Sequence, residues 1–188
     1  KFVKYLIQNN LPVKNLVESD FVIINQELAK HYGIAGVDGV EFQKVELPRD
    51  SLRGGLLTQA SILKLTADGT TTSPVLRGVW INEKILGSHI SPPPPNTPAA
   101  EPDVRGLKTI KEILKAHMNH KSCSGCHKTI DPPGFALESF DVMGAYRQHY
   151  RSLEEGSNPK MGMARNGKQF KYFQSTAIDS SSTIDAQT

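Results

Sequence analysis

A run of prolines is the feature that most restricts how this chain can fold. Six of the thirteen residues 91–103 (SPPPPNTPAAEPD) are proline. Proline lacks a backbone N–H and has a fixed φ, so this segment cannot continue a helix or pair within a sheet. We expect a stiff strap over residues 91–106, packed across the surface rather than acting as a mobile linker, with a separate segment, 1–90, before it.

The segment before the strap has mostly helical patterns. Apolar residues recur at helical spacing from Phe2, and a second short helix is predicted after Asn25, which is a suitable N-cap. The clearest helix begins at Ser73, which can cap it, and Pro74 fits its first turn. Alternating apolar residues at 42–47 indicate one short strand.

The chain after the strap is predicted to form a helical module over residues 107–152. An amphipathic helix (GLKTIKEILKAHMNHKS) leads this module. A Pro-Pro-Gly turn and a short helix around Ala136 to Met143 are expected to follow. Polar residues and glycine dominate residues 153–188, where we expect loops and one or two short strands near KQFKYF. The predicted fold class is therefore mainly α, with a Pro-rich strap and a loop-rich C-terminal part.

Both cysteines of the chain stand in one short motif. Cys123 and Cys126 are three positions apart, and His127 follows directly (CSGCH). C-x-x-C-H is the pattern of c-type haem attachment, in which two thiols add to the haem vinyl groups and the histidine ligates the iron. The motif therefore predicts a helical domain with one covalent haem c, held by Cys123 and Cys126, with His127 as the proximal ligand of the iron.

Two other chemistries use a cysteine pair with this spacing. A structural zinc site needs a second pair of ligands, and His117 and His120 are too close to the cysteines for familiar zinc-knuckle spacings. A thioredoxin-like disulfide begins a helix after a buried strand, whereas here a lysine-rich helix precedes the motif. Both remain alternatives, and the pattern favours haem over either.

The motif does not define the sixth ligand of the iron, which is usually methionine or a second histidine. Met143 follows His127 by sixteen residues, enough chain to pass round the edge of a haem. His117 lies on the apolar face of the preceding helix. We expect Met143 to be the sixth ligand, with His117 as the second candidate and an open position as the third.

The remaining charged residues give weaker signals. Glu138 and Asp141 share a helical side, and we expect a solvated pair or helix caps rather than acid–base chemistry. Arg147 is expected either to be exposed or to bind a haem propionate. Basic and acidic residues are mixed along a chain of net charge +3, which predicts no nucleic-acid partner. No apolar run approaches the length that spans a bilayer.

The order of several segments resembles that of exported planctomycete-cytochrome-type multi-domain proteins. The segments are NQELAKHYGI, RGGLLTQASILKLTADGTTTSPVLRGVWINEKILG, PPPP and CSGCHKTIDPPGFALESFDVMGAYR, which together cover residues 20–150 in round numbers. In those proteins a C-x-x-C-H module lies among domains of unknown function. The resemblance implies haem c on Cys123 and Cys126, proximal His127, and export to the periplasm or cell surface. It also implies that this chain is a piece of a longer protein, with a further domain beginning in 153–188.

The predicted function is one-electron transfer through a single haem. The expected partner is a redox protein or a neighbouring domain of the same parent chain. The alternative is a structural or binding module of a cell-surface protein, in which the haem mainly staples the fold. A peroxidase-like enzyme needs a distal acid–base residue, and because no such signature is visible we expect no enzymatic activity from this chain by itself.

Overall fold

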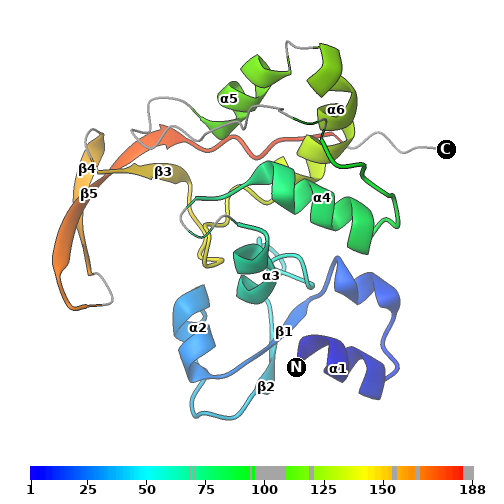
Figure 1. Cartoon of the computed structure of the whole chain (residues 1–188). Helices are drawn as coiled ribbons and strands as arrows, with labels where there is room; N and C mark the ends of the chain where they lie inside the picture. The colour runs from blue at the N-terminus through cyan, green and yellow to red at the C-terminus, as the bar shows by residue number, and fades with distance from the viewer. Residues whose placement is uncertain are drawn as a thin grey trace. The chain divides into compact units, whose positions relative to one another are not determined.

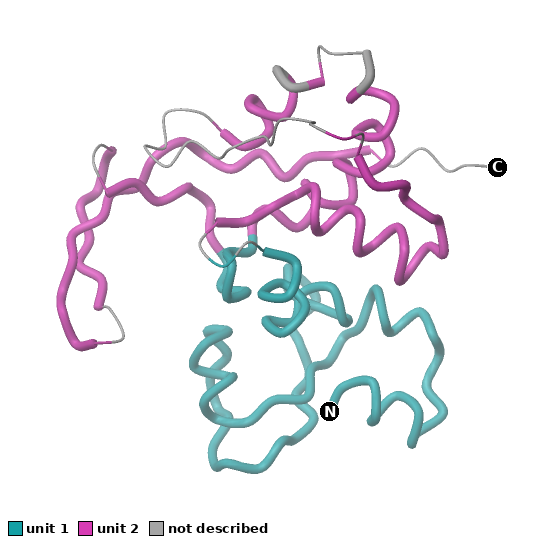
Figure 2. Tube along the Cα trace, viewed as in Figure 1, with its two compact units in different colours: residues 1–70, 140–146 teal, residues 71–139, 147–188 magenta. Residues whose placement is uncertain are grey.

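The computed structural model of the chain describes residues 1–67, 69, 71–93, 95, 109–118, 121–153, 156–163 and 166–183. These residues contain six α-helices, one short 3-10 helix and five strands (Figure 1). They form two compact units (Figure 2): unit 1 is residues 1–70 with 140–146, and unit 2 is 71–139 with 147–188. We call residues 140–146 the inserted turn. None of the described helices is both long and apolar enough to cross a bilayer.

Unit 1 is built on a two-stranded antiparallel sheet, in which Phe21 lies opposite Glu46. Its elements are α1 (Phe2–Gln8), η1 (Val13–Leu16), β1 (Phe21–Ile24), α2 (Gln26–Tyr32), β2 (Gln43–Glu46) and α3 (Ala60–Leu65). One apolar cluster joins β1 to α2 through Ile24 and Ala29, which are both 1% exposed. The Asn25 side chain accepts a hydrogen bond from the backbone N–H of Leu28, so the predicted N-cap of α2 is confirmed.

Arg53 holds the inserted turn within unit 1. Its guanidinium is buried and donates to the carbonyl oxygens of Thr58 at 2.6 Å and Gly144 at 2.7 Å. The same group lies 3.7 Å from the centre of the Tyr32 ring and 5.0 Å from that of Phe140. Burial lowers the pKa of Arg53 from its ordinary value, but arginine starts so far above neutrality that it stays charged. The buried cation is thus stabilised by two carbonyl groups and two aromatic faces.

Unit 2 combines three helices with a three-stranded antiparallel sheet of strand order β3-β5-β4. Its elements are α4 (Pro74–Lys84), α5 (Ile110–His117), α6 (Lys121–Phe135), β3 (His149–Ser152), β4 (Ser157–Met163) and β5 (Gln169–Ala177). A core of Ile110, Leu114 and Phe135 joins α5 to α6. The Ser73 side chain caps α4 by accepting from the N–H of Leu76, which confirms the predicted start of that helix.

Helices α4 and α6 meet backbone to backbone, as their neighbouring ribbons in Figure 1 suggest. A Cβ added to Gly78 in α4 would lie 1.8 Å from the carbonyl oxygen of Ile130. A Cβ added to Gly134 in α6 would lie 1.9 Å from the carbonyl oxygen of Pro74. No side chain fits at either distance, so the two glycines set how closely these helices pack.

The predicted fold class, mainly α with a loop-rich C-terminal part, is wrong. The protein is mixed α/β, with two antiparallel sheets. The strand expected near KQFKYF is confirmed as β5, which pairs with both β3 and β4. Strand β1 is a four-residue apolar run, too short for periodicity to separate from helix. Strand β4 contains Pro159 and Gly162 and is mostly exposed. It therefore depends on pairing with β5 rather than on its own pattern.

The region after the cysteine motif also differs from the prediction. We expected a Pro-Pro-Gly turn there, but α6 continues through Pro132 and Pro133 to Phe135. The short helix expected around Ala136 to Met143 is replaced by turns and an isolated β-bridge between Phe140 and Tyr146. Most of the predicted strap, 91–106, lies outside the described residues, and the domain boundaries given above stay predictions.

Candidate functional site

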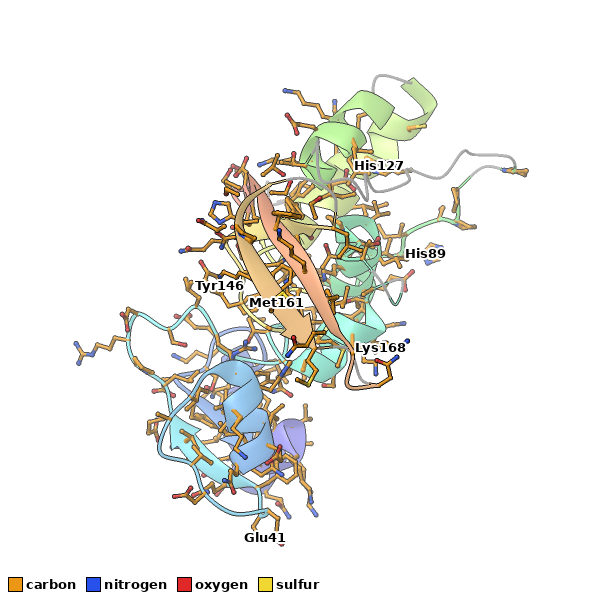
Figure 3. All side chains as sticks on the ribbon, turned by 90° about the vertical axis from the view of Figure 1, so that its left-hand side faces the viewer. Glu41, His89, His127, Tyr146, Met161 and Lys168 are labelled. Atoms are coloured by element: carbon orange, nitrogen blue, oxygen red, sulfur yellow. The ribbon has the colours of Figure 1, made fainter. Side chains whose placement is uncertain are left out.

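The cysteine motif lies in the first half of α6, on which Figure 3 labels His127. Residues three and four positions apart share one face of an α-helix, so Cys123, Cys126 and His127 point to the same side. Cys123 is half-buried, Cys126 is exposed, and neither forms a disulfide. The helix therefore presents two accessible thiols and one imidazole as a single group.

His127 is oriented by a carboxylate one helical turn further on. Its Nδ1 lies 2.9 Å from Oδ1 and 3.0 Å from Oδ2 of Asp131. The side chain of Asp131 is 2% exposed and that of His127 15%. An ionised carboxylate can only accept hydrogen bonds, so Nδ1 is the ring nitrogen that donates to Asp131 and Nε2 is the one directed away from it. Asp131 is not among the site residues predicted from the sequence, although its position four residues after His127 could have revealed it.

The two prolines after Asp131 explain how this part of α6 is anchored. Pro132 and Pro133 have no N–H to donate to the carbonyl groups one turn earlier. One of those groups belongs to Thr129, and its oxygen accepts a hydrogen bond of 3.3 Å from Nδ2 of Asn82. Asn82 also donates to the Gly78 carbonyl at 2.8 Å. A side chain from α4 thus replaces a missing helical bond within one turn of His127.

Helix α5 packs beside α6 and ends at His117, the second candidate for the sixth ligand. His117 therefore belongs to the same unit as the cysteine motif. Its side chain is outside the described part of the structure, and so is the whole of His120. Their suggested roles as an iron ligand or as zinc ligands stay untested predictions.

Met143, the first candidate for the sixth ligand, lies in the inserted turn and thus in unit 1, whereas His127 lies in unit 2. Its side chain is 46% exposed. Its carbonyl oxygen lies 2.6 Å from Nε2 of His31, and Oδ1 of Asp141 accepts from its N–H at 2.9 Å. The structure does not bring Met143 and His127 together within one unit, and the assignment of Met143 stays a prediction.

Glu138 differs most from its expected environment. We expected a solvated carboxylate or a helix cap, but the side chain is fully buried in unit 2. Nη2 of Arg147 donates to Oε1 at 2.9 Å, and the Thr72 hydroxyl donates to the same oxygen. Arg77, also fully buried, places Nη1 3.7 Å from Oε2. This buried network could not be found from sequence spacing, since Thr72 and Glu138 are 66 residues apart.

Burial dominates the electrostatics of the Glu138 network. It raises the pKa of Glu138 above its ordinary value of 4.5, because the carboxylate loses water, while Arg147, the Thr72 hydroxyl and Arg77 oppose the shift. The pKa of Tyr150 is raised too, first by burial and then by the charge of Glu138. Arg147 thus pairs with a protein carboxylate in this structure.

The donor set of α6 fits a c-type haem. Two thiols share one face of the helix with an imidazole whose Nδ1 bonds to a carboxylate, and metal-ligating histidines usually have such a second partner. Within the described side chains, no three His, Cys, Asp or Glu residues gather as a metal-ion site. The candidate cofactor site is the cysteine motif with His127, which is held by Asp131.

Comparisons with known proteins match two separate parts of the chain. The model of PSCyt3, described as a protein of unknown function (DUF1588), matches residues 53–150. The model of PSD4, also a protein of unknown function (DUF1592), matches residues 1–34. Both are planctomycete cytochrome-associated domains of unknown function. No curated protein and no solved structure matches the chain.

Proposed function

Because this chain belongs to the PSCyt3 family, we propose that it carries one covalent haem c and transfers single electrons. Cys123 and Cys126 are the attachment residues, and His127 is the proximal ligand of the iron. The observation that carries the proposal is the arrangement on α6, where the thiols share a helical face with an imidazole oriented by Asp131.

The attachment chemistry needs no change of oxidation state. Cys123 and Cys126 would hold the haem through their Sγ atoms, each thiol adding as S–H across one vinyl group so that its hydrogen would go to the neighbouring vinyl carbon. Cys126 is exposed and Cys123 half-buried, so both thiols are accessible on the folded helix. Each attachment would be a thioether, and no leaving group would be released.

The residues of α6 and α4 hold and orient the proximal ligand. His127 offers Nε2 to the iron, because Asp131 engages Nδ1 at 2.9 Å. Asn82 holds the Thr129 carbonyl group, and the contact between Gly78 and Ile130 fixes this turn of α6 against α4. The haem, when bound, supplies a one-electron Fe(III)/Fe(II) couple.

The rest of the functional proposal follows from haem attachment. Met143 is the first candidate for the sixth ligand and His117 the second. Maturation of c-type haem places the chain in the periplasm or at the cell surface, and its electrons pass to a redox protein or to a neighbouring domain of the parent chain. The competing function is a structural or binding module in which the haem mainly stabilises the fold.

Absorption spectroscopy tests the attachment site. The chain is produced in a host that matures c-type haem, and the haem is identified by its alkaline pyridine spectrum. The double variant Cys123→Ser/Cys126→Ser should lose all covalent haem, and His127→Ala should lose the low-spin spectrum. His89→Ala, a change at an exposed histidine of the same unit, is the matched control and should behave as the wild type. Covalent haem in the double variant would refute the proposed attachment.

A further inference from the structure

We propose that Asp131 is a positioning residue that lowers the reduction potential of the iron bound by His127. This inference rests on the proposed haem site and adds a residue that sets how the site works. The sequence motif ends at His127, so nothing in it assigns a role to Asp131. The distance from Asp131 to His127, the burial of this carboxylate and its fixed position support the role.

The geometry makes Asp131 a specific partner of the proximal histidine. Both carboxylate oxygens lie within 3.0 Å of Nδ1 of His127. The spacing of four residues places the two side chains one above the other on α6. The carboxylate therefore engages the ring nitrogen that does not face the iron.

Burial makes the effect of this carboxylate strong. Asp131 is 2% exposed, and water screens its charge much less than it would screen a surface carboxylate. A carboxylate that accepts from Nδ1–H pulls the proton toward itself and raises the basicity of Nε2. A more basic ligand stabilises Fe(III) over Fe(II), so the reduction potential falls.

The position of Asp131 is fixed from both sides along the helix. Before it, the Thr129 carbonyl group is held by Asn82, and the Ile130 backbone is pressed against Gly78. After it, Pro132 and Pro133 restrict the backbone. Because this turn is rigid, the carboxylate is already held in place to bond the imidazole. It does not have to be ordered again each time the iron changes oxidation state.

The experiment compares reduction potentials in the haem-loaded chain by spectroelectrochemistry. Asp131→Asn keeps the size of the side chain and removes its charge, so the potential should move to a more positive value. Asp131→Glu keeps the charge and should return the potential toward that of the wild type. Glu83→Gln, which removes one negative charge from α4 in the same unit, is the control for net charge and should leave the potential unchanged. A purely structural role of Asp131 would not produce this ordering.

The outcomes separate this inference from the proposed function. A wild-type chain without haem would end the proposed function and this inference together. A haem-loaded Asp131→Asn variant with the wild-type potential would overturn the inference alone. If Asp131→Asn fails to fold, proton NMR of the wild-type haem protein still decides. The Nδ1–H of His127 should exchange slowly with solvent, and rapid exchange would contradict the bond to Asp131.

Discussion

The fully buried Glu138 and the partly buried Arg147 form an ion pair in which Nη2 of the arginine donates to Oε1 of the carboxylate at 2.9 Å. The two residues flank the inserted turn. The backbone N–H of Arg147 also donates to the carbonyl oxygen of Ser139 at 2.8 Å. The chain therefore leaves unit 2 and returns to it at two points that are joined to each other. One link is the side-chain ion pair, and the other is the backbone hydrogen bond.

Removing the Glu138 side chain should strongly destabilise unit 2. Glu138→Ala leaves the buried guanidinium groups of Arg77 and Arg147 without their carboxylate, which costs about 3–5 kcal/mol. Glu138→Gln keeps an acceptor oxygen and the shape of the side chain and should cost less. Urea unfolding followed by fluorescence of Trp80, the only tryptophan, reports on this unit. Equal losses in the two variants would contradict the account.

The raised pKa of Glu138 predicts how the stability of the wild type, relative to that of Glu138→Gln, changes with pH. Since its pKa in the folded protein lies above the ordinary 4.5, the carboxyl group contributes stability that is fully present below 4.5. That contribution is lost as the pH rises through the pKa that Glu138 has in the folded protein. The free energy of unfolding of the wild type, relative to Glu138→Gln, should therefore fall as the pH increases from 4.5. A relative free energy that rises over this interval would show that ion pairing outweighs burial.

The contact between α4 and α6 predicts opposite effects for two glycines. Gly78→Ala would place a Cβ 1.8 Å from the Ile130 carbonyl oxygen, and forcing the helices apart should cost about 1–3 kcal/mol or more. Gly125→Ala adds a methyl group where nothing lies within 4 Å and should stabilise α6 by about 0.5–1 kcal/mol. The urea midpoint of each variant checks the pair. A Gly78→Ala chain as stable as the wild type would mean that the helices do not touch here.

Arg53 should anchor the inserted turn within unit 1. Arg53→Lys keeps the charge, but a lysine cannot donate to the carbonyl groups of both Thr58 and Gly144 and also stack on the two aromatic rings. The substitution should therefore lower the stability of unit 1 by about 1.5–3 kcal/mol. Hydrogen–deuterium exchange should accelerate at residues 140–146. Arg49→Lys, at an exposed arginine nearby in sequence, is the control. Unchanged exchange in the Arg53 variant would show that the turn is held by other contacts.

Two single variants identify the sixth ligand in the haem-loaded chain. If Met143 binds the iron, Met143→Leu should remove the methionine-to-ferric-iron absorption band and lower the reduction potential. His117→Ala should leave both unchanged. The reverse pattern would assign the position to His117, and no change in either variant would leave both candidates without support.

Local features of the fold could be predicted from the sequence because they depend on neighbouring residues. Asn25 and Ser73 begin helices at the predicted places, since a cap needs only the next turn of backbone. Strand β4 could not be predicted, because its formation depends on β5. The path of α6 through Pro132 and Pro133 was also missed, because Asn82 in α4 supplies a replacement partner for one carbonyl group.

The candidate site also has some features that could be predicted from the sequence and others that could not. Cys123, Cys126 and His127 are adjacent in sequence, so the motif alone placed them on one structural element. The bond from His127 to Asp131 follows from helical spacing and could have been predicted once the helix was known to extend past residue 130. The burial of Glu138 could not, because it depends on Thr72, Arg77 and Arg147 meeting in three dimensions.

The most direct test of the central claim is the alkaline pyridine spectrum of the wild-type chain made in a host that matures c-type haem. It should be combined with the mass of the intact, denatured protein. The account predicts the spectrum of a haem with both vinyl groups converted to thioethers, and a mass increased by one haem. A protein whose mass equals that of the bare chain, with no haem spectrum, would contradict it.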